Sequence, residues 1–187
     1  MLFKSTLLFS LAASALALPA SLDERKTKAA AASGTGTGTA ADVLTVQDYA
    51  DFQVSDGVAG NALAEVQAKF PIDTSNLAAV SANDLAIIQA ARDTAESAET
   101  DAFNPAIDAA GGTSSAAGKS LQFGKIKNKV EKLYLEVLAL QIQQAQGKDT
   151  ADKIAEEQKK LDNNIKLDTA AKGQASQSVE FEGDDAP

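Results

Sequence analysis

Lys125 to Gln146, KIKNKVEKLYLEVLALQIQQAQ, form the one long apolar helical stripe in the chain. The apolar residues recur at alternating spacings of four and three, which places them on one side of a helix. They are Ile126, Val130, Leu133, Val137 and Leu140. Leu138 and Ile142 widen the stripe, so this helix has apolar surface for more than one neighbour. We therefore expect it to be the central helix of a small all-α domain.

The composition excludes most catalytic chemistry. The chain has 187 residues, 44% of them hydrophobic, and contains no Cys and no His. Thiol nucleophiles, imidazole bases, Ser-His-Asp triads, zinc sites of the usual kind and ferritin-type metal sites are therefore excluded. Carboxylates are plentiful, but their spacing selects no pair for acid/base work. We predict no catalytic residue, no cofactor and no metal site.

The charge is unevenly distributed along the chain. The formal net charge is -9, which argues against a nucleic-acid partner because such partners require clustered basic surface. Residues 42–110 carry twelve acidic and two basic side chains, whereas residues 119–172 carry eleven basic and eight acidic ones. One interpretation is ion pairing between the two halves. The other is a basic patch for an anionic surface or glycan, formed by Lys119, Lys125, Lys127, Lys129 and Lys132.

Both ends of the chain are predicted to lie outside the folded domain. Residues 1–17 have Lys4, an apolar run and a small-residue cleavage site, as a secretory signal peptide does. The run is too short to span a membrane. Residues 18–41, with their alternating Gly and Thr, predict a disordered propeptide or linker. Residues 173–187 are polar and acidic, and we expect a disordered tail.

The first of four expected helices runs from Thr45 to the residue before Pro71. Thr45-Val46-Gln47-Asp48 resembles a capping box, and Pro71 ends the helix. Gly57 and Gly60 lie inside this pattern and are unfavourable in a helix, so we expect a kink, a break or a tight helix crossing there.

Three further helices complete the expected domain. The second begins at a capping signal at Ser81 and ends or bends at Asn104-Pro105, the third begins near Ser120, and the fourth opens at Asp149-Thr150. Gly147 caps the third helix, and the short connection after it makes the last two helices an antiparallel hairpin. The expected fold is an antiparallel up-down four-helix bundle over residues 42–172.

Three aromatic residues lie partly off the apolar stripes. Phe103, Phe123 and Tyr134 are either the edge of the core or an apolar patch for a partner or a hydrophobic surface. The sequence leaves both interpretations open.

One segment resembles a known group of proteins. Asp48 to Pro71, DYADFQVSDGVAGNALAEVQAKFP, resembles a segment of small secreted, alanine-rich proteins of filamentous ascomycete fungi. The organisation is more distantly similar to that of fungal hydrophobic-surface-binding proteins and cell-wall mannoproteins. The resemblance implies secretion and a helical fold, and it transfers no functional residue.

We therefore expect a secreted, monomeric, non-enzymatic interaction protein that is extracellular or associated with the cell wall, with effector activity as one version. Its partner would be a protein, a glycan or a hydrophobic surface. The alternative is an extracellular carrier, in which loose packing between the helices leaves a cavity for a lipid or another apolar ligand.

Overall fold

The computed structural model describes residues 41–183. The predicted signal peptide at residues 1–17 lies outside the described residues. So do the predicted linker, apart from Ala41, and the last four residues of the predicted tail.

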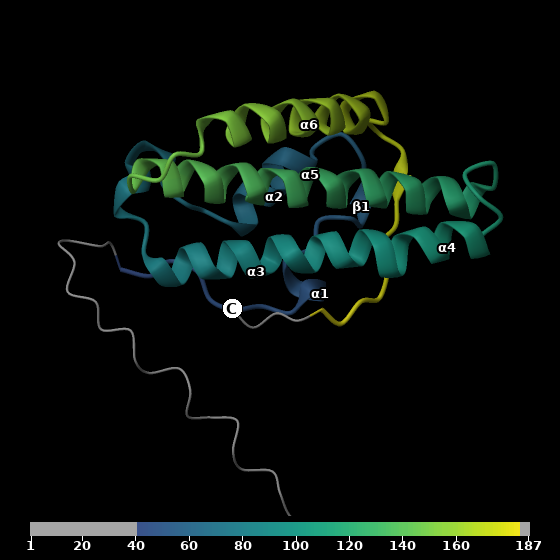
Figure 1. Ribbon diagram of the computed structural model, residues 1–187. Helices are drawn as coiled ribbons and strands as arrows, with labels where there is room; N and C mark the ends of the chain where they lie inside the picture. Colours follow the sequence, from purple (N-terminus) through teal and green to yellow (C-terminus); the bar gives the residue numbers. More distant parts are fainter. Residues whose placement is uncertain (1–40, 184–187) are drawn as a thin grey trace, which may run out of the picture. The chain divides into compact units, whose positions relative to one another are not determined.

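The described part of the chain is mostly helical, as predicted (Figure 1). Two very short strands pair antiparallel, with Gly57 opposite Ser176 and Val58 opposite Ala175. In chain order, the elements are α1 (Tyr49–Phe52), β1 (Gly57–Val58), α2 (Ala62–Lys69), the 3-10 turn η1 (Thr74–Ala79), α3 (Ala82–Ala98), the π-helical turn η2 (Glu99–Phe103), α4 (Asn104–Ala109), α5 (Ala116–Ala145), α6 (Ala151–Ala170) and β2 (Ala175–Ser176).

Helix α5 is the central element, as its apolar stripe predicts. It lies between α3 and α6 and also contacts α2, α4 and β2 (Figure 1). Ile126, Val130, Leu133 and Val137 are buried, whereas Leu140 is half-buried. A helix covered by several neighbours needs such a broad apolar surface.

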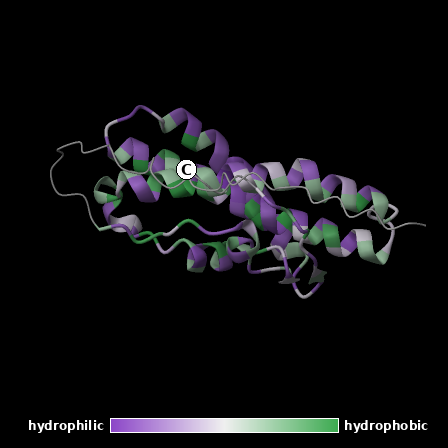
Figure 2. Cartoon of the chain, turned by 90° about the horizontal axis from the view of Figure 1, so that it is seen from below, coloured by the Kyte–Doolittle hydropathy of each residue, from purple (hydrophilic) through white to green (hydrophobic). Residues whose placement is uncertain are grey.

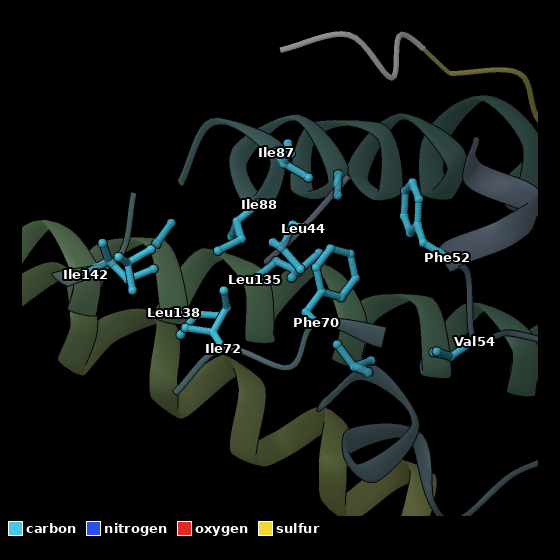
Figure 3. Packing of buried hydrophobic residues seen from close by; sticks show 14 of the residues in the cluster. Leu44, Phe52, Val54, Phe70, Ile72, Ile87, Ile88, Leu135, Leu138 and Ile142 are labelled. Atoms are coloured by element: carbon cyan, nitrogen blue, oxygen red, sulfur yellow. The ribbon is translucent and has the colours of Figure 1, made fainter. Parts of the chain in front are cut away.

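The core is built from the second half of α5 and the elements around it. Leu135, Leu138 and Ile142 of α5 point toward Ile88 of α3 and toward Phe70, which follows α2 (Figure 3). Burial of each large apolar side chain contributes about 1.5–3 kcal/mol relative to exposure. Figure 2 shows hydrophobic and hydrophilic residues interspersed along the long helices, as expected for helices with one buried face.

The alanine stripe of α3 lets this helix pack closely on α5. Ala91, Ala95 and Ala98 are 5%, 0% and 0% exposed, and small side chains allow two helices to approach each other. Ser81 caps α3 as predicted, because its Oγ accepts a hydrogen bond from the Asp84 amide at 3.0 Å. The helix continues beyond Pro105 into α4 through the wider turn η2.

The first expected helix is broken rather than continuous. Residues 53–61 separate α1 from α2, and residues 41–48 are extended, so the predicted capping box at Thr45 does not form. Gly57 and Gly60 have φ angles of 85° and 115°, which a helix does not contain. Asp168 of α6 accepts hydrogen bonds from the Gly60 and Ala62 amides at 2.8 and 2.9 Å, and so caps the start of α2.

The last two long helices form the predicted antiparallel hairpin. Helix α5 begins at Ala116, four residues before the expected start, because Ser115 accepts a hydrogen bond from the Gly118 amide at 2.9 Å. Gly147 follows α5 with φ of 94°, as expected for a glycine that ends a helix.

The prediction of a disordered tail from residue 173 is wrong for residues 173–183, which we call the C-terminal strap. The Gln177 amide donates to the Ser120 carbonyl at 3.0 Å, and the Ser178 amide donates to Asp56 Oδ1 at 2.9 Å. The Phe181 ring packs edge-on against Tyr49, with 5.8 Å between the centroids. The strap has little apolar surface, so its composition resembles that of a disordered segment, but backbone hydrogen bonds hold it.

Gly124 of α5 makes room for the strap. A Cβ atom at this position would lie 1.9 Å from the Gln177 carbonyl oxygen, which is a backbone atom. The strap therefore passes over α5 at a point where only glycine fits.

Gly124→Ala is expected to displace the strap. Alanine normally stabilises a helix interior by about 1 kcal/mol relative to glycine, but here the new methyl group collides with the Gln177 carbonyl. We expect the amide hydrogens of Gln177 and Ser178 to exchange faster with solvent, as measured by hydrogen–deuterium exchange mass spectrometry.

Gly118→Ala is the matched control, since it makes the same change in the same helix. Its Cβ would lie 2.0 Å from the Gly112 carbonyl oxygen, so exchange should increase at the turn before α5 and not in the strap. Equal exchange of the strap in Gly124→Ala and in the unmodified chain would contradict the role of Gly124.

Candidate functional site

The five lysines of the predicted basic patch do not share one surface. Lys119 is exposed near the start of α5, whereas Lys127 is 0% exposed and lies inside the molecule. Lys129 and Lys132 both pair with Glu99, the first residue of η2, at 3.1 and 2.9 Å. Lys125 donates to Asn104 Oδ1 at 2.6 Å.

The contact between α3 and α5 contains ion pairs between the acidic and the basic halves of the chain. This is the other interpretation of the charge pattern. Although burial opposes it, hydrogen bonds and charge from Lys132 and Lys129 hold the pKa of Glu99 below its usual range. The ion-pair network contains four cations and four carboxylates, so these groups carry no net charge. Its members are Arg92, Asp93, Glu96, Glu99, Lys125, Lys129, Lys132 and Glu136.

Lys127 holds the loop that interrupts the first expected helix. Its ammonium group donates to the Asp56 carbonyl at 2.7 Å and to the Val58 carbonyl at 3.3 Å, and it pairs with Glu65 at 2.8 Å. Three acceptors satisfy the three donors of a charged lysine. These hydrogen bonds and the ion pair offset the cost of burying the cation and hold the non-helical path of residues 53–61.

A second buried contact joins three elements. The Tyr49 hydroxyl of α1 donates to Asn128 Oδ1 at 2.7 Å, and Asn128 Nδ2 donates to the Ala95 carbonyl of α3 at 2.8 Å. Burial raises the pKa of Tyr49. The phenol therefore stays a neutral hydrogen-bond donor.

Glu131 is the most unusual buried group. It is 0% exposed, and among the described residues neither of its carboxylate oxygens has a hydrogen-bond partner. Burial raises its pKa well above the usual range, and the charge of Lys69, the nearby Val54 amide and Lys127 oppose that shift only in part. The Val54 amide is close but makes no well-formed hydrogen bond. We call Tyr49, Lys127, Asn128 and Glu131 the buried polar cluster.

The three aromatic residues of the predicted apolar patch are not brought together. Phe103 is 0% exposed and belongs to the core side of η2. Phe123 and Tyr134 are half-buried and lie about three turns apart on α5. Tyr134 packs against both halves of the core. For Phe103, the core interpretation is the one that the structure shows.

An apolar cleft opens beside the N-terminal segment, residues 41–48. Leu44, Phe52, Phe70 and Ile87 line it, and Figure 3 labels all four within the packed core cluster. The N-terminal segment is held there because Asp84 accepts hydrogen bonds from the Val43 and Leu44 amides. Only about 20 Å³ of the cleft admits the centre of a water molecule, so it has room for about one water.

Two exposed valines border this region. Val43 is 58% exposed and Val46 is 48% exposed. Val46 also lines the cleft. Val43 lines a separate small hollow with Ile72 and Val80. We call the apolar residues of the cleft, together with Val43 and Val46, the apolar rim.

Two larger hollows, of about 480 and 330 Å³, lie beside Phe181 and beside Arg92. No group of three or more Asp or Glu side chains among the described residues is placed to hold a metal ion. No described helix is long and apolar enough to cross a membrane.

The buried polar cluster was missed because its residues look like surface residues. A signal does exist: counting back from Leu138 by the spacings of a helix face leads to Tyr134, Glu131 and Lys127. Charged residues on such a face are usually exposed, so the pattern alone does not identify the cluster.

Glu131→Gln is expected to make stability less dependent on pH. Because the folded-state pKa of Glu131 is raised, the folded chain binds more protons than the unfolded chain above the ordinary Glu pKa of about 4.3. Stability then falls as pH rises, by up to about 1.4 kcal/mol per pH unit, until pH reaches the raised pKa. Urea unfolding from pH 4 to pH 8 measures the slope for the variant and the unmodified chain.

Glu99→Gln serves as the control, because the pKa of Glu99 is shifted in the opposite direction to that of Glu131. The pKa of Glu99 is lowered, so its contribution to stability is present above the unfolded pKa and is lost as pH falls through the folded one. This variant should lose stability at neutral pH and match the unmodified chain at low pH. A Glu131→Gln variant with the same pH slope as the unmodified chain would refute the neutral buried carboxyl.

Comparison with known proteins identifies the family of the chain. A family model described as a domain of unknown function (DUF8454) matches residues 44–180, well over half of the chain. No curated protein and no solved structure matches. The matched segment includes the buried polar cluster, the apolar cleft and most of the C-terminal strap. The chain therefore belongs to the DUF8454 family of domains of unknown function.

Proposed function

We propose that the chain is a secreted, non-enzymatic interaction protein, extracellular or associated with the cell wall, that binds a partner through the apolar rim. The observation that carries this proposal is the exposure of Val43 and Val46 beside the apolar cleft. Apolar side chains that stay exposed beside an apolar cleft support a contact site there. The leader-like residues 1–17 support export.

The use of the carboxylates supports a non-enzymatic function. Asp84 and Asp168 are buried and accept hydrogen bonds from backbone amides, which fixes chain segments. Glu99 is paired with lysines, and Glu131 is sealed inside the molecule. Acid/base catalysis needs a carboxyl group within reach of a substrate, and these four are engaged elsewhere.

The alternative, a carrier of a lipid or another apolar ligand, has weaker support. Ligand pockets usually measure about 300–1,000 Å³, whereas the apolar cleft has room for about one water. The hollows of about 480 and 330 Å³ have charged side chains in their linings, among them Glu182 and Arg92, which suit an apolar ligand poorly. A surface that contacts a partner without enclosing it agrees better with this cleft. Host-directed effector activity and a glycan partner remain versions of the same proposal.

We further propose that the domain is a monomer and a variant of an up-down four-helix bundle. In this variant, α2 is the remnant of the first helix, and α3 with α4, α5 and α6 are the other three. The contacts of α2 with both α5 and α6 support this arrangement.

Val46→Asp is expected to weaken binding to hydrophobic material. A buried valine contributes about 1.5–3 kcal/mol, so its loss from a contact should reduce retention on octyl-agarose and on isolated fungal cell walls by about tenfold or more. Leu167→Asp is the matched control, because Leu167 is 45% exposed on α6, outside the apolar rim. Equal losses in the two variants would mean that the rim is not the contact surface.

Export is expected to remove the N-terminal residues. Expression of the full chain in a filamentous fungus should yield protein in the culture filtrate whose intact mass corresponds to a start at Leu18 or later. Retention of the full-length chain inside the cells would contradict the proposal of a secreted protein.

A further inference from the structure

The C-terminal strap is bound through its backbone by a surface that we call the strap groove, formed by Tyr49, Asp56, Ala59, Ser120 and Gly124. The Ala59 amide donates to the Gln174 carbonyl at 3.0 Å, the Gln177 amide donates to Ser120, and the Ser178 amide donates to Asp56. Figure 1 shows the strap running from the end of α6 across α5 toward α1. Hydrogen bonds of this type are open to any extended segment, because each residue other than proline supplies the same groups.

Gly124 and Tyr49 also shape the strap groove. Gly124 lets the Gln177 carbonyl pass directly over α5. Beyond it, the Tyr49 ring receives Phe181 edge-on, and Tyr49 in turn packs edge-on against Phe52 with 5.5 Å between the centroids. The groove therefore combines backbone pairing with one position that selects an aromatic side chain.

The strap itself is held by few side-chain contacts. Gln174, Ala175, Gln177 and Glu180 are exposed, and Phe181 is only half-buried. Within the described part of the chain, the Ser176 hydroxyl is buried without a hydrogen-bond partner. A buried, unsatisfied hydroxyl is unfavourable. The anchoring therefore rests on the backbone and on three half-buried side chains, Ser178, Val179 and Phe181.

We propose that the strap groove is a binding site for an extended peptide segment that carries an aromatic residue, and that the C-terminal strap occupies it until such a segment displaces it. This site is separate from the apolar rim. The partner pairs its backbone with Ala59 and Ser120 and places its aromatic ring on Tyr49. Gly173, with φ of 86°, is the point at which the strap leaves α6.

The attached strap competes with any free peptide. A segment tethered next to its own site has an effective concentration of the order of millimolar. The unmodified chain should therefore bind a peptide weakly, and a chain with a loosened strap should bind it more tightly.

The probe is a fluorescently labelled peptide with the sequence of residues 174–183, QASQSVEFEG, titrated against full-length protein by fluorescence polarisation. Phe181→Ala in the protein removes the ring that anchors the strap, and we expect saturable binding about tenfold tighter than to the unmodified chain. Glu180→Ala, an exposed position in the same strap, should bind as the unmodified chain does. A peptide with alanine in place of its phenylalanine should bind about tenfold more weakly to the Phe181→Ala protein.

A disulfide lock tests the site without depending on the fold of a loosened variant. A Cβ atom built at Gly183 lies 3.1 Å from Thr94 Cβ, close to the separation of about 3.5–4.5 Å found in disulfides, and the chain has no other cysteine. The Thr94→Cys, Gly183→Cys protein, carrying Phe181→Ala as well, should not bind the peptide when oxidised and should bind it after reduction.

Three results would overturn the proposal. One is the absence of saturable binding to Phe181→Ala at millimolar peptide, and another is equal binding to the oxidised and reduced locked proteins. The third is continued exchange protection of the Gln177 amide in both Phe181→Ala and Ser178→Pro, because the strap would then be held by more than the contacts described.

Discussion

The structure depends on the burial of α5 by neighbours on several sides. A helix in this position makes both apolar and polar contacts with its neighbours. In α5, the apolar contacts and the polar contacts lie on different parts of the helix. The second half, with Leu135, Leu138 and Ile142, packs into the apolar core. The first half carries Lys127, Asn128 and Glu131, which face α1, α2 and the loop between them. Packing energy comes mainly from one half, and the path of the chain is fixed mainly by the other.

The features that follow from local rules are the ones that the sequence predicts well. The spacing of apolar residues identifies α5, and Ser81 and Gly147 mark the start of α3 and the end of α5, because caps depend on neighbouring residues alone. The charge imbalance between the two halves likewise corresponds to the ion pairs of Glu99 with Lys129 and Lys132.

The features that depend on distant residues are the ones that the sequence does not reveal. Lys127 and Asp168 hold the break before α2. Asp168 lies more than a hundred residues after the break in the sequence. The C-terminal strap is ordered by backbone groups, whose hydrogen bonds leave no mark in hydropathy or composition. Lys127 of the buried polar cluster lies in the lysine pattern that predicts a surface patch, and Val46 of the apolar rim lies in the pattern that predicts a helix cap.

The wide turn η2 has a consequence for the register between α3 and α4. A π-helical turn closes hydrogen bonds one residue further apart than an α-helix does, and one residue corresponds to about 100° of rotation. The buried face after the turn is thus set at a different angle from the alanine face before it, which brings Phe103 and Ile107 inward. Removal of one residue from this turn would give a more regular helix whose continuation presents the wrong side chains to α5.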